Sequence, residues 1–260
     1  MKIGVCIKQV IDSNARLEIS NVNIRAPSNA LRMNEFDEFA LEEAIRLKEK
    51  IGAEVIAITL GPLTAVNELT KAFAMGADKA IRIDNSILES WDANTTAKIL
   101  SHVIGTLGLD LIFCGIQSTD DLYSQVGILV SEKLGLPHVS AVTHIEEINQ
   151  EIKTAKLAKE VGGGFKQIVE VPLPAVLIIQ SGINLPRYVS TIAMLQNRSK
   201  KVTGMSATAF FPKEELEKSN MLKILSLSTS SKERPSEPIV GTAPEIASIL
   251  VQKLKEANVF

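Results

Sequence analysis

Short β-rich runs alternate with amphipathic helical stretches through the first half of this 260-residue chain, and this alternation constrains its fold most strongly. The runs at 2–10, 54–60, 79–84 and 110–115 are typical of strands, and the stretches between them have helical periodicity. Strands separated by helices of this length imply right-handed crossovers and a mostly parallel sheet with helices on both faces. The sequence therefore predicts an α/β fold.

The helix expected after the first strand has clear start signals. Asn34 is typical of a helix N-cap, and Asp37 stands where an acidic residue closes a capping box. An apolar stripe predicts the buried face: Phe36, Ala40, Leu41, Ala44, Ile45 and Leu47. We interpret the acidic pair Glu42 and Glu43 as part of the solvated face. Further helices are expected at 64–75, 93–107 and 123–134.

The pattern changes from His138 onward. Segments typical of antiparallel ribbons surround a flexible glycine triplet, and an apolar strand follows them: 139–148, 151–158, 167–171 and then 174–180. Beyond Gly182 come a short helix near 192–196, a basic patch, a polar stretch and a last amphipathic helix near 243–257. We expect an α/β domain over residues 1–190 and a C-terminal arm with its helix over 191–260.

Composition narrows the possible partners and compartment. The 28 basic and 30 acidic residues are mixed along the chain, so nucleic acid is not an expected partner. The sequence has neither an apolar run long enough for a membrane span nor a signal pattern at its N-terminus, which predicts a cytoplasmic protein without membrane insertion. Cys6 and Cys114 lie in apolar runs and are expected to be buried thiols. The three histidines have no metal-binding spacing, so no metal site is expected.

The loop Gly115–Gln125 is the strongest candidate binding site. Ligands of open parallel sheets bind beyond the carboxyl ends of the strands, and here a buried strand ends at a glycine before a helix start. Backbone N–H groups, Ser118, Thr119 and the helix N-terminus could hold a phosphate. Asp120 and Asp121 would repel phosphate unless they face ribose hydroxyls or cap the helix, so ordinary capping stays an alternative. The turn at Gly61 and the helix start at 34–37 are weaker candidates.

Catalytic signatures are absent from the sequence. It contains neither a GxGxxG nor a Walker A motif, which removes support for a nicotinamide site or a P-loop. It also contains no GxSxG motif and no plausible Cys–His nucleophile pair. The residues alone thus predict a nucleotide-binding α/β domain without catalytic residues.

Five segments in order along the chain resemble the electron-transfer flavoprotein beta family. They are VCIKQVID (5–12), MNEFDEFALEEAIRLKE (33–49), AMGADKAIRI (74–83), DLIFCGIQSTDD (110–121) with QVG (125–127), and LPAVLIIQSGINLPRY (173–188). The last segment, an apolar strand followed by N-x-P-R-Y, is the most specific match. The resemblance covers essentially the whole chain.

The resemblance implies a flavodoxin-like, doubly wound, mostly parallel sheet with an added antiparallel ribbon and an extended C-terminal arm that docks on an alpha subunit. This domain would hold AMP, while the alpha subunit carries the redox FAD. The implied nucleotide site comprises Cys6, Asn34, Glu35, Phe36, Asp37, Leu60, Gly115, Ile116, Gln117, Ser118, Thr119, Asp120, Asp121, Leu122, Tyr123, Ser124, Gln125 and Val126. Phe36 matches a position near the alpha-subunit flavin, with a core role as the alternative. Ser13 stands where some members have an aromatic residue beside that flavin.

The segment after the signature strand corresponds to the family's recognition loop for a flavin dehydrogenase, of the acyl-CoA type or another, that docks transiently. The implied docking residues are Asn184, Leu185, Pro186, Arg187, Tyr188, Thr191, Ile192 and Leu195. Thr191 replaces a leucine of several members, so Leu185, Ile192 or Leu195 is expected to serve as the apolar anchor. Arg198, Lys200 and Lys201 keep some of the basic character that follows this loop in the family.

The implied function is that of an electron carrier subunit, which passes electrons through the alpha-subunit FAD from a dehydrogenase to a downstream acceptor. One alternative is a bifurcating variant that holds a second FAD in this chain and oxidises NADH. A second is a universal-stress-like nucleotide-binding protein without a redox role. A third, an adenylating enzyme, is disfavoured because no SGG-like loop follows the first strand.

Overall fold

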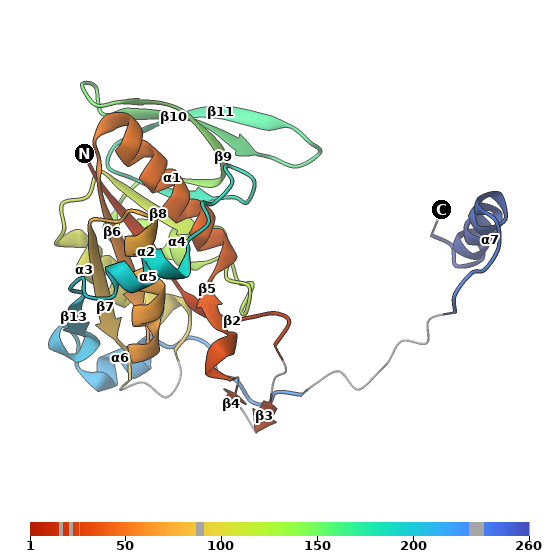
Figure 1. The fold of residues 1–260 in the computed structure, drawn as a ribbon, viewed down its shortest axis with the longest axis horizontal. Helices are drawn as coiled ribbons and strands as arrows, with labels where there is room; N and C mark the ends of the chain where they lie inside the picture. Colours follow the sequence, from red (N-terminus) through yellow and green to blue (C-terminus); the bar gives the residue numbers. More distant parts are fainter. Residues whose placement is uncertain (16–17, 21–22, 26, 87–90, 229–236, 260) are drawn as a thin grey trace.

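A nine-stranded sheet forms the centre of the described part of the chain, with strand order β11-β10-β9-β12-β8-β1-β6-β7-β13 (Figure 1). The computed structural model describes residues 1–260 except 16–17, 21–22, 26, 87–90, 229–236 and 260. The strands of this sheet are β1 (Lys2–Cys6), β6 (Glu54–Leu60), β7 (Lys79–Asp84), β8 (Leu111–Gly115), β9 (His138–Asn149), β10 (Thr154–Glu160), β11 (Lys166–Pro172), β12 (Ala175–Ile179) and β13 (Thr203–Ser206).

Strand direction confirms the predicted fold class. The strands from β9 to β13 in the sheet order pair in parallel, and β10 and β11 add an antiparallel ribbon at one edge. Around β1 the strands lie in the order β7-β6-β1-β8, the 3-2-1-4 arrangement of dinucleotide-binding sheets rather than the 2-1-3 order of flavodoxin itself. The chain therefore changes direction across the sheet between β1 and β8.

Helices cover both faces of the sheet. The helices are α1 (Glu35–Ile51), α2 (Val66–Met75), α3 (Ala93–Gly105), α4 (Val126–Leu134), α5 (Thr191–Asn197), α6 (Lys213–Ser219) and α7 (Ala243–Glu256), with 3-10 turns η1 (Ser28–Ala30), η2 (Leu63–Ala65) and η3 (Ala207–Ala209). Because side chains alternate along a strand, β1 sends Ile3 and Val5 into a core with α1 and α2. It sends Cys6 into a second core with α3 and α4.

The segment predicted as one strand over 2–10 is two strands in the structure. β1 stops at Cys6, and β2 (Gln9–Ile11) pairs antiparallel with β5 (Leu31–Met33) outside the main sheet. The polar excursion between them contains a second small pair, β3 (Glu18–Ser20) with β4 (Asn23–Arg25). The β2–β5 pair brings the start of α1 beside the end of β1, and this contact builds one wall of the site described below.

The chain beyond residue 190 has two parts. β13 extends the sheet beside β7, and Ala207 and Leu216 are buried against the α3 face, so this part belongs to the body. By contrast, α7 buries none of its side chains and stands apart from the sheet in Figure 1. The centre of the polar stretch before it lies outside the described residues. Among the helices that the structure describes, none combines the length and apolar character that a bilayer crossing requires.

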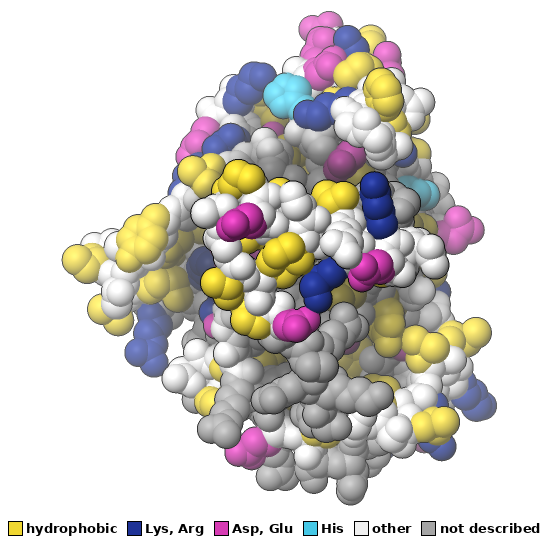
Figure 2. Space-filling model, turned by 90° about the vertical axis from the view of Figure 1, so that its right-hand side faces the viewer, with side chains coloured by type: hydrophobic (Ala, Val, Ile, Leu, Met, Phe, Trp, Pro, Cys, Tyr) yellow, Lys and Arg dark blue, Asp and Glu magenta, His cyan; other side chains and the backbone are white. Residues whose placement is uncertain are grey.

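Charged side chains of both signs are mixed on the surface. Figure 2 shows Lys and Arg interspersed with Asp and Glu over the visible face, in agreement with a formal net charge of -2.

Candidate functional site

A pocket opens at the carboxyl ends of β1, β6 and β8, where the strand order reverses. The open space around its lining residues, mouth included, is about 830 Å³. The structure brings together these predicted residues in its lining: Cys6, Asn34, Asp37, Leu60, Gly115, Ile116, Gln117, Ser118, Asp121, Tyr123, Ser124, Gln125 and Val126. Five predicted residues lie beside the pocket without lining it: Glu35, Phe36, Thr119, Asp120 and Leu122.

Asn34 is the N-cap residue of α1, as predicted, but its side chain holds the pocket loop. This side chain makes no cap hydrogen bond to the helix. Instead, Nδ2 donates to the Gln117 carbonyl at 2.9 Å, and Oδ1 accepts from the Thr119 N–H at 3.1 Å. The side chain is 1% exposed, so these backbone groups have little access to competing water. Asn34 therefore fixes the loop that follows β8.

Asp37 joins the ends of two neighbouring strands. Its buried carboxyl group accepts the Lys8 N–H at 2.8 Å and the Gly115 N–H at 3.1 Å. Neither bond belongs to the expected capping box, because both donors come from other elements. Burial raises the pKa of Asp37 to about 7, against the two N–H donors and the nearby Asn34 and Lys8, which lower it.

We expect Asp37→Asn to flatten the dependence of stability on pH. An unfolded Asp titrates near pH ~4, so the folded chain binds the extra proton between about pH 4 and 7. This stabilisation is fully present below about pH 4 and is lost as pH rises through the folded pKa. The free energy of unfolding of the wild type should therefore fall by roughly 2–3 kcal/mol between about pH 5 and 8. Urea unfolding of both proteins across this pH range measures the change. A wild-type slope in Asp37→Asn would contradict the assignment of this proton to Asp37.

Lys8 neutralises the acidic part of the loop. Its Nζ contacts Asp120 Oδ1 at 2.7 Å, Asp121 Oδ2 at 2.6 Å and Ser118 Oγ at 3.3 Å. Burial of Lys8 acts to lower its pKa, but the two carboxylates outweigh that effect and raise it. Asp120 and Asp121, whose charges would repel phosphate, are thus paired with a cation, and their remaining acceptor positions suit hydroxyl groups.

The end of the loop favours an anion. Leu122 and Ser124 have left-handed φ values of 57° and 55°, an uncommon conformation for residues with a Cβ that is often found at functional sites. α4 starts directly afterwards, and the side chain of its N-cap residue, Gln125, makes no cap hydrogen bond. The first N–H groups of a helix have no intrahelical acceptor, so those of α4 lack a cap from the Gln125 side chain as well. The helix dipole adds partial positive charge beside them.

Eight lining residues were missed by the sequence prediction: Ile7, Lys8, Trp91, Asp92, Ala93, Thr96, Leu100 and Cys114. Those next to Cys6 and Gly115 could have been found, since they flank strand ends already selected. The start of α3 carried no such signal, because no strand end precedes it directly. There Asp92 caps α3 through Thr95 N at 2.9 Å and also accepts from Met221 N at 2.6 Å, which leads the later part of the chain past the pocket.

Comparison with known proteins places this chain in a family. A family model described as "Electron transfer flavoprotein domain" matches residues 24–210, most of the chain. The chain belongs to the electron transfer flavoprotein family. Its resemblance to the beta subunits, predicted from five sequence segments, is confirmed.

Several relatives show the extent of the similarity. The electron transfer flavoprotein subunit beta of Methylophilus methylotrophus is 36% identical over 210 residues, 79% of each chain. That of Thermoanaerobacterium thermosaccharolyticum is 33% identical over 265 residues, all of both chains. The acryloyl-CoA reductase electron transfer subunit gamma of Anaerotignum propionicum is 29% identical over 271 residues, again all of both chains.

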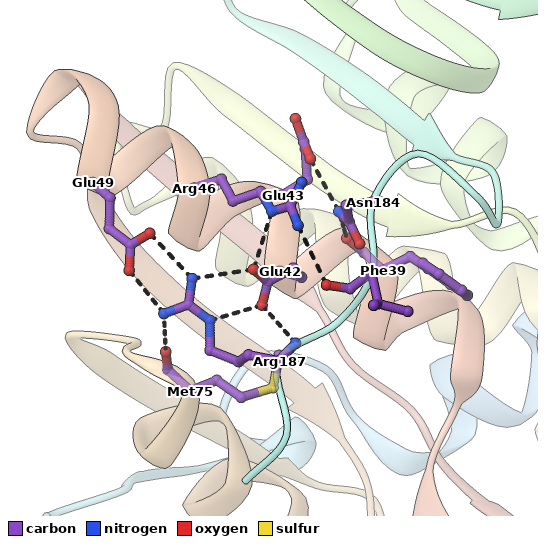
Figure 3. Close-up of polar contacts among 9 residues, drawn as sticks. Phe39, Glu42, Glu43, Arg46, Glu49, Met75, Asn184 and Arg187 are labelled. Carbon is purple, nitrogen blue, oxygen red and sulfur yellow. Dashed lines mark hydrogen bonds and ion pairs between the residues drawn. The ribbon is translucent and has the colours of Figure 1, made fainter.

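The N-x-P-R-Y segment of this electron transfer flavoprotein chain is anchored on α1 (Figure 3). Arg187 binds Glu42 and Glu49, and Asn184 donates to the Phe39 carbonyl and to Glu43, each at 3.0 Å. Glu42 is only 3% exposed. The prediction that Glu42 belongs to a solvated face is therefore wrong, because its cationic partner approaches from a segment 145 residues away.

Other residues of the predicted docking set point outward. Leu185 is 81% exposed and Tyr188 is 89% exposed, and Ile192 and Leu195 on α5 are exposed as well. Pro186 is half-buried and Thr191 is exposed. The segment 184–195 thus contains residues that hold it to α1 and apolar residues that face solvent.

Proposed function

We propose that this chain is the beta subunit of a heterodimeric electron transfer flavoprotein, with AMP in the pocket at the carboxyl ends of β1, β6 and β8. The observation that supports this best is the loop 115–126, which Asn34 and Asp37 hold open at the switch point of the sheet. The FAD of an alpha subunit would supply the redox chemistry, accepting electrons from a dehydrogenase and passing them to a downstream acceptor. We place the complex in the cytoplasm.

The pocket residues fit an adenosine phosphate. The first N–H groups of α4 suit the phosphate, while the carboxylate of Asp121 suits ribose hydroxyls. Trp91 and the apolar groups of Leu60 and Leu100 give the lining surfaces against which a purine can pack. A side chain at position 115 would fill the base of the pocket loop, which fits the glycine found there.

Two surfaces suit protein partners. The exposed apolar residues of 185–195 are followed by Arg198, Lys200 and Lys201, so a flavin dehydrogenase with an apolar pocket and an acidic rim is the complementary partner. α7 exposes Ile249, Leu250 and Val251 without packing on the described body. We propose that this helix docks on the alpha subunit, since an isolated amphipathic helix of this length is marginal in water.

Co-expression with a candidate alpha subunit tests the proposed function. We expect a yellow heterodimer that a flavin dehydrogenase reduces, with a single FAD in the complex and AMP in the acid-released fraction. Absorbance of the released flavin, measured against protein concentration, gives the number of FAD molecules per heterodimer. Two FAD per heterodimer would contradict AMP in this pocket and favour the bifurcating alternative, in which this chain holds the second FAD. A colourless chain that recruits no flavin-bearing partner would contradict the electron-transfer role altogether.

A further inference from the structure

We infer that Glu42 is a positioning residue, which fixes the docking segment 184–195 on α1 through Arg187; this inference rests on the docking role proposed above. Glu42 touches neither the pocket nor the exposed apolar residues. It acts through the backbone and guanidinium of Arg187, which stands between Leu185 and Tyr188 in the chain (Figure 3).

The carboxylate of Glu42 is saturated with donors. One oxygen accepts the Arg187 backbone N–H at 3.1 Å and its Nε at 2.8 Å, and the other accepts Arg187 Nη2 and Arg46 Nε, both at 3.1 Å. The opposite edge of the same guanidinium binds Glu49 at 2.8 and 3.1 Å. Two planar fork contacts on one guanidinium leave Arg187 little freedom to rotate.

The clamp formed by Glu42, Arg46, Glu49 and Arg187 fixes the backbone of the segment as well as the Arg187 side chain. The bond to the Arg187 N–H holds the main chain, and Arg46 reaches the Leu185 carbonyl at 3.3 Å. Asn184 adds its bond to the Phe39 carbonyl. These contacts bracket Leu185 on both sides, so the direction of this exposed side chain is set by polar contacts with α1.

Apolar packing holds this segment without burying it fully. α5 lies against α2 but has no fully buried residue, and Ile183 and Val189 pack partly against the core. A buried ion pair is rarely more stabilising than apolar residues of the same size, because both charges lose their hydration. Burying Glu42 is therefore better explained by the geometry that it imposes than by stability alone.

The charges of the cluster are nearly balanced. Burial acts to raise the pKa of Glu42, but the hydrogen bonds from Arg187 and Arg46 outweigh it and keep this pKa below its ordinary value. The carboxylate therefore stays charged at neutral pH, and its removal leaves Arg187 with the exposed Glu49 and the Met75 carbonyl as partners. We expect the segment to loosen without unfolding of the sheet.

The test compares three variants of the full complex: Glu42→Gln, which removes the charge, Arg187→Lys, which removes the fork, and Glu215→Gln as the control. Glu215 of α6 is likewise an ion-paired carboxylate, bound to Lys98 Nζ at 2.7 Å, but its partner lies on α3 rather than in the segment 184–195. Hydrogen exchange is followed in peptides covering 184–195 and, for comparison, 115–125. Electron transfer is measured with the flavin dehydrogenase that reduces the parent complex fastest.

For Glu42→Gln and Arg187→Lys we expect exchange in 184–195 to rise about 10-fold, with 115–125 unchanged. The KM for the dehydrogenase should rise about 10-fold while kcat changes less than about 2-fold, as for loss of binding geometry alone. Glu215→Gln should change each quantity less than about 2-fold, because an exposed ion pair contributes little. Unchanged exchange in 184–195, or faster exchange with an unchanged KM, would overturn the positioning role. A parent complex that no flavin dehydrogenase reduces would instead contradict the proposed function.

Discussion

Gly115→Ala is expected to destabilise the chain by about 2–4 kcal/mol and to abolish nucleotide retention, because a methyl group at this position has no room. A Cβ would lie 2.4 Å from Asp37 Oδ1 and 2.8 Å from both the carbonyl carbon and the Cβ of Phe36. Phe36 is in the first turn of α1, and Asp37 is held by two N–H donors, so neither can yield cheaply. The methyl group would also displace the Gly115 N–H from Asp37. Urea unfolding and the nucleotide content of the purified protein measure the two effects.

Gly105→Ala is the matched control for this substitution. Gly105 ends α3, and a Cβ there meets only Leu134 Cδ2 at 3.5 Å, an ordinary contact. Since Ala favours helix over Gly, stability should stay unchanged or rise by up to about 1 kcal/mol. Equal behaviour of the two variants would contradict the steric account of Gly115.

Asn34→Ala is expected to cost about 2–4 kcal/mol of stability and to weaken nucleotide binding about 10- to 100-fold. The substitution leaves the Gln117 carbonyl and the Thr119 N–H without their buried partner, and the loop loses its tie to α1. Equilibrium binding of AMP to protein freed of nucleotide measures the affinity. Urea unfolding measures the stability.

Asn94→Ala offers a comparison at similar chemistry, because Asn94 does not line the pocket although it lies at the start of α3 beside residues that do. The Asn94 amide donates to the Ser219 carbonyl at 2.8 Å, on the α3 side of the molecule. Stability is expected to fall by about 1 kcal/mol, with the affinity for AMP unchanged. If Asn34→Ala also left the affinity unchanged, the loop would not be the nucleotide site.

Local patterns predicted the elements that position the site. Periodicity and strand-end turns located β1, β6, β7, β8 and the helices between them, since each forms its pattern within a single segment. The strand-end rule then selected the loop after β8, which does line the pocket. Short edge elements such as β13 were missed, because four residues carry too little pattern to be recognised.

Contacts between distant segments could not be predicted from local patterns. Asn34 and Asp37 stand at the start of α1 like capping residues, but the partners of their side chains come from the segment after β1, the end of β8 and the loop after β8. Glu42 follows the helical period of an exposed face, and only the return of the chain at Arg187 buries it. In each case a polar side chain has two possible uses, and tertiary contacts decide between them.

Nucleotide release from the heterodimer tests the central claim most directly. Acid-denatured complex, purified without added nucleotide, should yield AMP in equal amount to this chain, and the complex of Asn34→Ala should yield much less. A wild-type complex that releases no adenine nucleotide beyond the single FAD of the alpha subunit would contradict the assignment of the pocket.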